Sequence, residues 1–130
     1  MDSEADTLSH GRNRGFPETI GPIFQRDGHY CLAVEARHAN THSTAHGGLL
    51  TAFADQAIGW TVLDMLEPGE SCLTLQLSTR FVGGAAVGDM IWIQVSVPKR
   101  TRSYMFVTAT VLTGDEPVAL CEGIWRVIRT

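Results

Sequence analysis

The chain is poor in cysteine and in positive charge. Cys31, Cys72 and Cys121 are odd in number, far apart and without a CxxC pair, which favours buried free thiols in a reducing compartment over a disulfide framework. The formal net charge is -4, so a broad electrostatic attraction to nucleic acid or to an anionic membrane is not expected. Lys99 is the only lysine, and the remaining positive charge is arginine.

The N-terminus lacks the apolar core of a secretory signal. Its sequence, MDSEADTLSHGRNRG, predicts a flexible tail over residues 1–15. No repeat, linker or low-complexity block interrupts the rest. We therefore expect one cytoplasmic domain over residues 16–130, a length that suffices for one hydrophobic core.

The apolar pattern predicts an α+β protein. Two extended runs flank Asp27-Gly28, which is a hairpin signal. Apolar residues at helical spacing then predict a helix from Gly47 to about Leu66, ended by Pro68-Gly69. Four strand-like runs follow, "LTLQLSTRF", "MIWIQVSV", "YMFVTATVL" and "VALCEGIWRVI". A curved antiparallel sheet wrapped round one long helix would cover the helix's apolar surface.

A lone carboxylate, Asp55, lies inside this apolar helix. A charge in an apolar setting costs several kcal/mol unless it is paired or solvated. Asp55 is therefore either a polar contact at an interface or a general base or nucleophile in a cleft. The residues alone do not separate these two interpretations.

The helix is introduced by His46-Gly47-Gly48. Glycines there allow a ligand to approach the backbone, and the free N–H groups at a helix start favour developing negative charge. This arrangement can serve as an oxyanion hole. Gly47 and Asp55 are separated by ~12 Å along one helix, so both can serve one carbonyl only if they come from two chains related by a twofold axis.

The spaced pattern of Asn40, His46-Gly47-Gly48 and Asp55, followed by "TLQLSTRF", resembles the hotdog-fold acyl-CoA thioesterases. The most similar subgroup is the phenylacetate-pathway type, which includes thioesterase superfamily member two. The resemblance covers roughly residues 20–130. It implies a helix wrapped by an antiparallel sheet, homodimers with active sites shared between subunits, and pairing of dimers into tetramers.

The resemblance also implies roles for individual residues. The Gly47 N–H would polarise the thioester carbonyl, and His46 would shape the start of the helix. Asn40 would orient water or the thioester. Asp55 of the facing subunit would act as general base or nucleophile, and Thr74 would help to place the water. Hydrolysis would need no cofactor, with CoA as part of the substrate.

Substrate contacts are expected from a second set of residues. Gly48 extends the backbone site at the helix start, and Trp60, just over one turn after Asp55, would line the acyl pocket. Lys99, Arg100 and Arg102 form a basic cluster between two predicted strands. In an acidic chain, such a cluster is suited to the phosphates of CoA.

Other interpretations of the sequence remain open. His38, His42 and His46 recur at a helical spacing that would suit a metal, but the residues between them are poor helix formers, so no metal is expected. A non-catalytic acyl-CoA-binding hotdog protein and a hotdog hydratase or dehydratase are the alternative functions. The acyl group and the choice between CoA and an acyl carrier protein are not encoded in any motif that we recognise.

Overall fold

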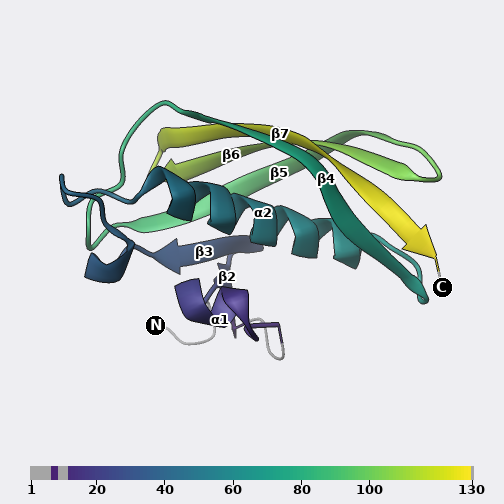
Figure 1. The fold of residues 1–130 in the computed structure, drawn as a ribbon, viewed down its shortest axis with the longest axis horizontal. Coiled ribbons are helices and arrows are strands. Elements are labelled where there is room, and N and C mark those ends of the chain that lie inside the picture. The colour runs from purple at the N-terminus through teal and green to yellow at the C-terminus, as the bar shows by residue number, and fades with distance from the viewer. Residues whose placement is uncertain (1–6, 9–11, 130) are drawn as a thin grey trace.

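The computed structural model describes residues 7–8 and 12–129. A seven-stranded antiparallel sheet curves round one long helix, α2 (Gly47–Asp64), and the short helix α1 (Phe16–Ile20) lies below β2 in the view of Figure 1. A second short helix, η1 (Ala36–His38), precedes α2 in the chain. The strands, in the order β1-β2-β3-β5-β6-β7-β4, are β1 (Thr7–Leu8), β2 (Phe24–Arg26), β3 (His29–Ala33), β5 (Met90–Arg100), β6 (Tyr104–Thr113), β7 (Glu116–Arg129) and β4 (Glu70–Phe81). The predicted α+β class and the sheet wrapped round one helix are confirmed.

The N-terminal part of the chain is only partly described. The flexible tail predicted for residues 1–15 falls largely on residues outside the described ones, and for those it stays a prediction. Thr7 and Leu8 pair with β2. The Asn13 side chain exchanges two hydrogen bonds with the backbone of Ile23. The short helix α1 was not predicted.

The hairpin predicted at Asp27-Gly28 is confirmed. Strands β2 and β3 pair in an antiparallel register that brings Arg26 opposite His29. Asp27 has φ 54° and Gly28 has φ 81°, the backbone that a two-residue turn between right-twisted strands requires.

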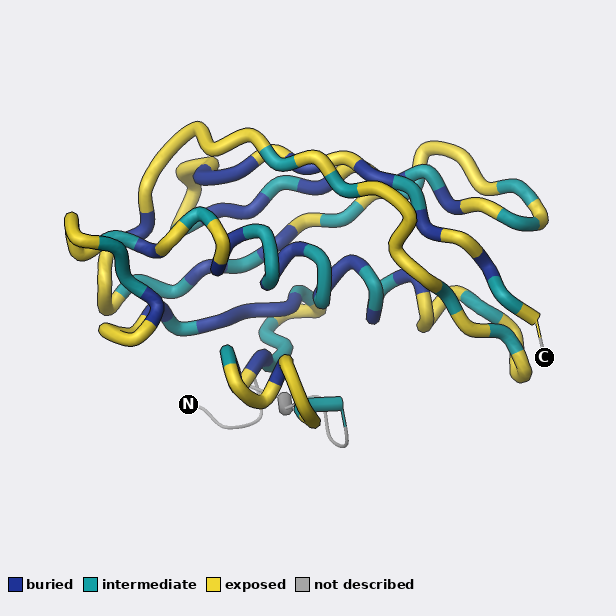
Figure 2. Tube along the Cα trace, in the orientation of Figure 1, coloured by how far each residue is buried: buried dark blue, intermediate teal, exposed yellow. Residues whose placement is uncertain are grey.

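The core lies between α2 and the concave face of the sheet. Phe53, Ala57 and Ile58 on α2 are 0% exposed. They pack in one cluster with large side chains of the sheet, including Met105 and Trp125. Burying a side chain such as Phe53 contributes about 1.5–3 kcal/mol, so this helix face holds the fold together. The opposite face of α2 is only partly covered (Figure 2).

Strand β4 differs from the alternation expected of it. The alternation of residues in the run LTLQLSTRF predicts that Leu73, Leu75 and Leu77 lie on one face of the sheet. A bulge lies between the pairs Thr74–Trp125 and Gln76–Ile124, so Leu75 has no opposite residue and the faces before it are exchanged. Leu73 is consequently 56% exposed, and Thr74 lies on the side of the strand that faces α2.

Among the described residues, no helix is long and apolar enough to cross a membrane.

The helix α2 ends at Asp64, two residues before the predicted Leu66.

Candidate active site

The start of α2 presents a free backbone donor. His46 is the N-cap, and its ring Nδ1 accepts a hydrogen bond from the Gly48 N–H at 3.0 Å. Among the described residues, the Gly47 N–H has no acceptor, as is usual for the first N–H groups of a helix. The donor and the helix dipole together favour a negatively charged oxygen at this position.

Asp55 lies two turns further along α2 and is held by β4. The Thr74 hydroxyl donates a hydrogen bond to Asp55 Oδ1 at 2.7 Å. Asp55 is half-buried, so its charge is both solvated and hydrogen-bonded, which removes the large cost expected for a carboxylate in an apolar setting. The bulge in β4 makes this contact possible, because it turns Thr74 toward the helix.

A thiol lies beside this pair. Cys72 is on the same side of β4 as Thr74, and its Sγ–H donates to the Gly59 carbonyl of α2 at 3.7 Å. Burial, and to a smaller extent the charge of Asp55, raise the pKa of the Cys72 thiol. A raised pKa keeps the group as a thiol, so it is unsuited to act as the nucleophile.

The two parts of the site line one open groove of about 750 Å³ between α2 and β4. Its lining residues are His46, Gly47, Gly48, Thr51, Ala52, Asp55, Thr74, Leu77 and Phe81. The groove thus brings together four of the five predicted catalytic residues. A Cβ added at Gly47 would lie 3.1 Å from the Phe81 ring, so this close approach is a reason for glycine at the helix start.

Asn40 and Trp60, both predicted to belong to the site, lie outside this groove. The Asn40 side-chain oxygen accepts hydrogen bonds from the backbone N–H groups of His42 and Thr44 and from the Thr44 hydroxyl, so it braces its own loop. Trp60 is 6% exposed and packs against Tyr30, with ring centroids 5.4 Å apart. Within one subunit, therefore, Trp60 does not line the groove that contains Asp55.

The basic cluster lies at the other end of α2. Arg100 donates to the Met65 carbonyl at 3.2 Å and lies 3.9 Å from a Glu70 oxygen. Lys99 and Arg102 are exposed, and in the described part of the chain neither has a carboxylate partner. Arg100 is therefore committed to the fold, whereas Lys99 and Arg102 are available to an anionic ligand.

No motif in the sequence singles out the apolar wall of the groove. This wall includes Phe81, Leu77 and Ala52, and Phe81 is 54% exposed. Its position at the end of a strand after a bulge is what places it over the helix start. Spacing along the strand could not reveal this contact, because Phe81 meets the helix start only in the folded chain.

His38 has a structural role in the described part of the chain. No group of three or more metal-ligating side chains occurs among the residues that the structure describes. His38 is buried, and its Nε2–H donates to the Ile20 carbonyl at 2.7 Å while its Nδ1 accepts from the Glu35 N–H at 2.9 Å. Both ring nitrogens of His38 are therefore occupied in a structural role.

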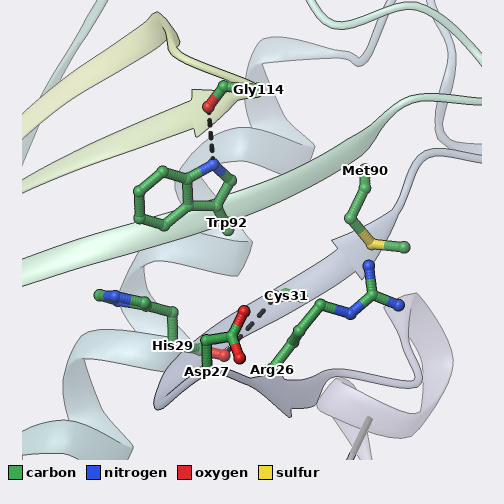
Figure 3. A pocket seen from close by; sticks show the side chains of 7 residues that line it. All are labelled: Arg26, Asp27, His29, Cys31, Met90, Trp92 and Gly114. Atoms are coloured by element: carbon green, nitrogen blue, oxygen red, sulfur yellow. Dashed lines mark hydrogen bonds between the residues drawn. The ribbon is translucent and has the colours of Figure 1, made fainter. Parts of the chain in front are cut away.

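A second hollow, of about 310 Å³, lies between the β2–β3 hairpin and β5 (Figure 3). Trp92 is fixed there by a hydrogen bond from its indole N–H to the Gly114 carbonyl at 2.9 Å, and His29 packs edge-on against it at 4.9 Å. This hollow shares no residue with the groove of Asp55, and it contains none of the predicted site residues.

Comparison with known proteins assigns the chain to a family. The profile of the thioesterase superfamily matches residues 42–120, which include the helix start, Asp55 and Thr74. The chain belongs to the thioesterase superfamily. The prediction of a thioester hydrolase with a hotdog fold is thereby confirmed.

Individual relatives agree with this assignment. A candidate esterase of Pseudomonas aeruginosa is 32% identical over 114 residues, which are 84% of this chain and 85% of the relative. The PaaI protein from the phenylacetic acid degradation operon of Escherichia coli has a TM-score of 0.76 at 20% identity, over 86% of this chain and 83% of that one. A Streptococcus mutans protein bound to acetyl-CoA has a TM-score of 0.72 at 23% identity, over 79% and 82% of the two chains.

Proposed function

We propose that this thioesterase hydrolyses acyl-CoA to a free carboxylic acid and CoA, using the groove between α2 and β4. The observation that carries the proposal is the hydrogen bond from Thr74 to Asp55 in a groove that also contains the unpartnered Gly47 N–H. Solved structures of the same fold with bound acetyl-CoA or CoA support CoA as the thiol, although an acyl carrier protein thioester has the same reacting group.

The chemistry follows from these groups. The Gly47 N–H donates a hydrogen bond to the thioester carbonyl oxygen and, aided by the helix dipole, stabilises the negative charge that develops there. Asp55 either takes a proton from the attacking water or attacks the carbonyl carbon itself. In the first route the carbon–oxygen bond to water forms, and the carbon–sulfur bond then breaks to release CoA. In the second route an Asp55 oxygen bonds to the carbonyl carbon and the carbon–sulfur bond breaks, which releases CoA and leaves a mixed anhydride. Water then cleaves the anhydride to the free acid and restores Asp55. Apart from the Gly47 N–H, both routes use only the Asp55 side chain and water.

One subunit does not supply both groups to one carbonyl. The helical rise separates Gly47 and Asp55 by ~12 Å, and both lie on the same continuous helix. We infer that Gly47 of one subunit and Asp55 of its twofold partner act together, so each dimer has two sites. His46 would fix the helix start, and Asn40 would reach the substrate from its braced loop.

The edge of the sheet offers a surface for this partner. Strand β4 is last in the strand order and pairs only with β7 among the described residues. Leu75 and Phe81 are more than half exposed on this strand. An open strand edge with exposed apolar side chains is suited to pairing with another strand. Pairing through β4 would bring the grooves of two subunits together. We also propose that two such dimers form a tetramer and that the protein is cytoplasmic.

A thioesterase assay tests the proposal directly. We expect purified protein to release free thiol from members of a panel of acyl-CoA substrates, and Asp55→Ala to lower kcat by orders of magnitude with the oligomer preserved. Asp55→Asn is the matched control for shape without charge, and it should be similarly impaired. Full activity of Asp55→Ala would refute the assigned role of Asp55. A wild type that binds but never hydrolyses acyl-CoA would instead indicate a non-catalytic acyl-CoA-binding protein.

A further inference from the structure

Another hollow, distinct from the one at Trp92 and with a largely apolar lining, adjoins the catalytic groove. It lies between α1 and α2, with a volume of about 300 Å³, which is at the lower end for ligand pockets. We name it the α1 pocket, and its lining residues are Phe16, Ile20, Arg37, His38, Ala39, His46, Gly48, Leu49 and Ala52. Phe16 is 58% exposed.

The α1 pocket and the groove of Asp55 share a wall. His46, Gly48 and Ala52 line both hollows. Gly48 and Ala52 are one helical turn apart and carry almost no side chain, so the ridge of α2 is low between the two hollows. A ligand whose reacting carbonyl lies at the helix start can therefore extend in both directions across α2.

The wall of the α1 pocket is held rigidly to the helix start. The Ile20 carbonyl accepts from His38, the His38 carbonyl accepts from the His46 N–H at 2.9 Å, and His46 Nδ1 accepts from the Gly48 N–H. A chain of hydrogen bonds thus joins the end of α1 to the oxyanion site. A group bound in the α1 pocket is consequently positioned relative to the reacting carbonyl.

The α1 pocket is chemically suited to an uncharged apolar group. Its one permanent cation, Arg37, donates to Glu35 Oε1 at 2.7 Å and to the backbone carbonyls of Thr19, Ile20 and Gly21. The Arg37 charge is therefore already used, and among the described residues no free cation lines the pocket to bind a second carboxylate. Phe16, Ile20 and Leu49 supply the apolar surface.

We propose that the α1 pocket is the acyl subsite of this thioesterase and that it accepts an uncharged apolar acyl group whose size is limited by Phe16. This inference rests on the proposed function. A thioester places its acyl and thiol parts on opposite sides of the carbonyl carbon, and two hollows meet at the helix start. The smaller one takes the acyl group, and the thiol part of the thioester lies on the side of the wider groove.

Two phenylalanines provide a matched pair of variants. Phe16 and Phe81 are exposed to a similar extent, 58% and 54%, and each lines only one of the two hollows. Phe16→Ala should move the kcat/KM optimum for straight-chain acyl-CoA toward longer chains, changing the long-to-short ratio about tenfold. Phe16→Trp should move it toward shorter chains. Phe81→Ala should alter kcat/KM by the same factor for every chain length.

The result that overturns the inference is a chain-length optimum that moves with Phe81→Ala, or with neither residue. Binding of S-alkyl-CoA thioethers, measured by calorimetry, gives a readout that needs no hydrolysis. Phe16→Ala should shift their chain-length order of affinity in the same direction. A wild type that hydrolyses nothing refutes the proposed function, while thioether binding still decides the location of the acyl group. Thioethers that do not bind, or whose order ignores Phe16, count against the pocket.

Discussion

At the scale of single residues, the pair of Asp55 and Thr74 separates this site from an ordinary buried carboxylate. The hydrogen bond of 2.7 Å fixes the direction in which Asp55 points, while the groove keeps it open to substrate. A carboxylate that is positioned and reachable can act as base or nucleophile. We therefore expect Thr74 to act by holding Asp55, and its part in placing the water stays a prediction.

Thr74→Val should lower kcat about tenfold to a hundredfold, because a hydrogen bond to a charged group contributes about 1.5–3 kcal/mol. The shape of the side chain is conserved, so KM should change little. Thr74→Ser keeps the hydroxyl and should retain most of the activity. Steady-state kinetics of the three proteins check this. Equal losses in the Val and Ser variants would indicate that packing, not the hydroxyl, matters.

Cys72 reports on the charge of Asp55. Burial and the Asp55 carboxylate raise the pKa of Cys72, so at a given pH it has less thiolate than an ordinary cysteine. Alkylation by iodoacetamide should therefore rise only at a pH above the usual range, near 8.5 for a free thiol. Asp55→Asn removes one of the two causes and should shift this rise to lower pH.

The internal control is Cys121, whose pKa is raised by burial without any contribution from Asp55. Mass spectrometry of the two cysteine-containing peptides measures both rates in one sample. The Cys121 profile should be the same in wild type and Asp55→Asn. A Cys72 profile that does not respond to Asp55→Asn would contradict the electrostatic contact between the two side chains.

At the scale of elements, local signals were sufficient for α2 and for the β2–β3 hairpin. Helical spacing in the run after Gly47 and the Asp27-Gly28 turn depend on neighbouring residues only. The helix α1 has five residues and depends on Arg37, which is distant in the sequence and binds its last carbonyls. The β4 bulge is likewise fixed by its partner β7. The placement of Thr74 therefore could not be derived from spacing.

The β5–β6 hairpin carries the basic cluster, and its charges differ in function. Lys99→Ala with Arg102→Ala should raise KM for acyl-CoA about two- to tenfold at low salt, since exposed charge pairs contribute about 0.2–1 kcal/mol each. The effect should shrink as salt is added. Arg100→Ala should instead lower the thermal stability, because Arg100 contacts Glu70 and the Met65 carbonyl.

Two controls make this test specific for the nucleotide phosphates. An acyl-pantetheine substrate lacks those phosphates, so its KM should not respond to the double variant. Arg126→Ala removes an exposed charge of the same kind from β7 and should leave KM for acyl-CoA unchanged. If acyl-pantetheine and acyl-CoA respond equally, the hairpin does not bind the phosphates.

At the scale of the whole molecule, the single chain contains the parts of the site but holds them apart. The sequence motif placed Gly47 and Asp55 on one helix, and the structure confirms one continuous helix between them. The motif also led to the expectation of a second subunit, through helical rise alone. What the sequence could not provide is the surface for that subunit. The exposed edge of β4 with Leu75 and Phe81 supplies a candidate.

Mixed dimers test whether the two groups meet across this interface. One variant carries Asp55→Ala, and the other carries Gly47→Pro, which removes the donor N–H. Proline is tolerated as the first residue of a helix. The preceding residue, His46, has φ -60° and ψ 141°, the extended conformation that a residue before proline prefers. The Phe81 ring must shift slightly, since a Cβ at Gly47 would lie 3.1 Å from it.

Each variant alone should be inactive, because every site of its homodimer contains the lesion. In a mixed dimer, isolated by two different affinity tags after co-expression, one site takes both lesions and the other takes neither. The mixed dimer should therefore regain about half of the wild-type activity, one site in two. No wild-type chain is present, so any recovered activity comes from complementation between subunits. Mixed dimers that assemble and stay inactive would show that Gly47 and Asp55 do not share a site across the interface.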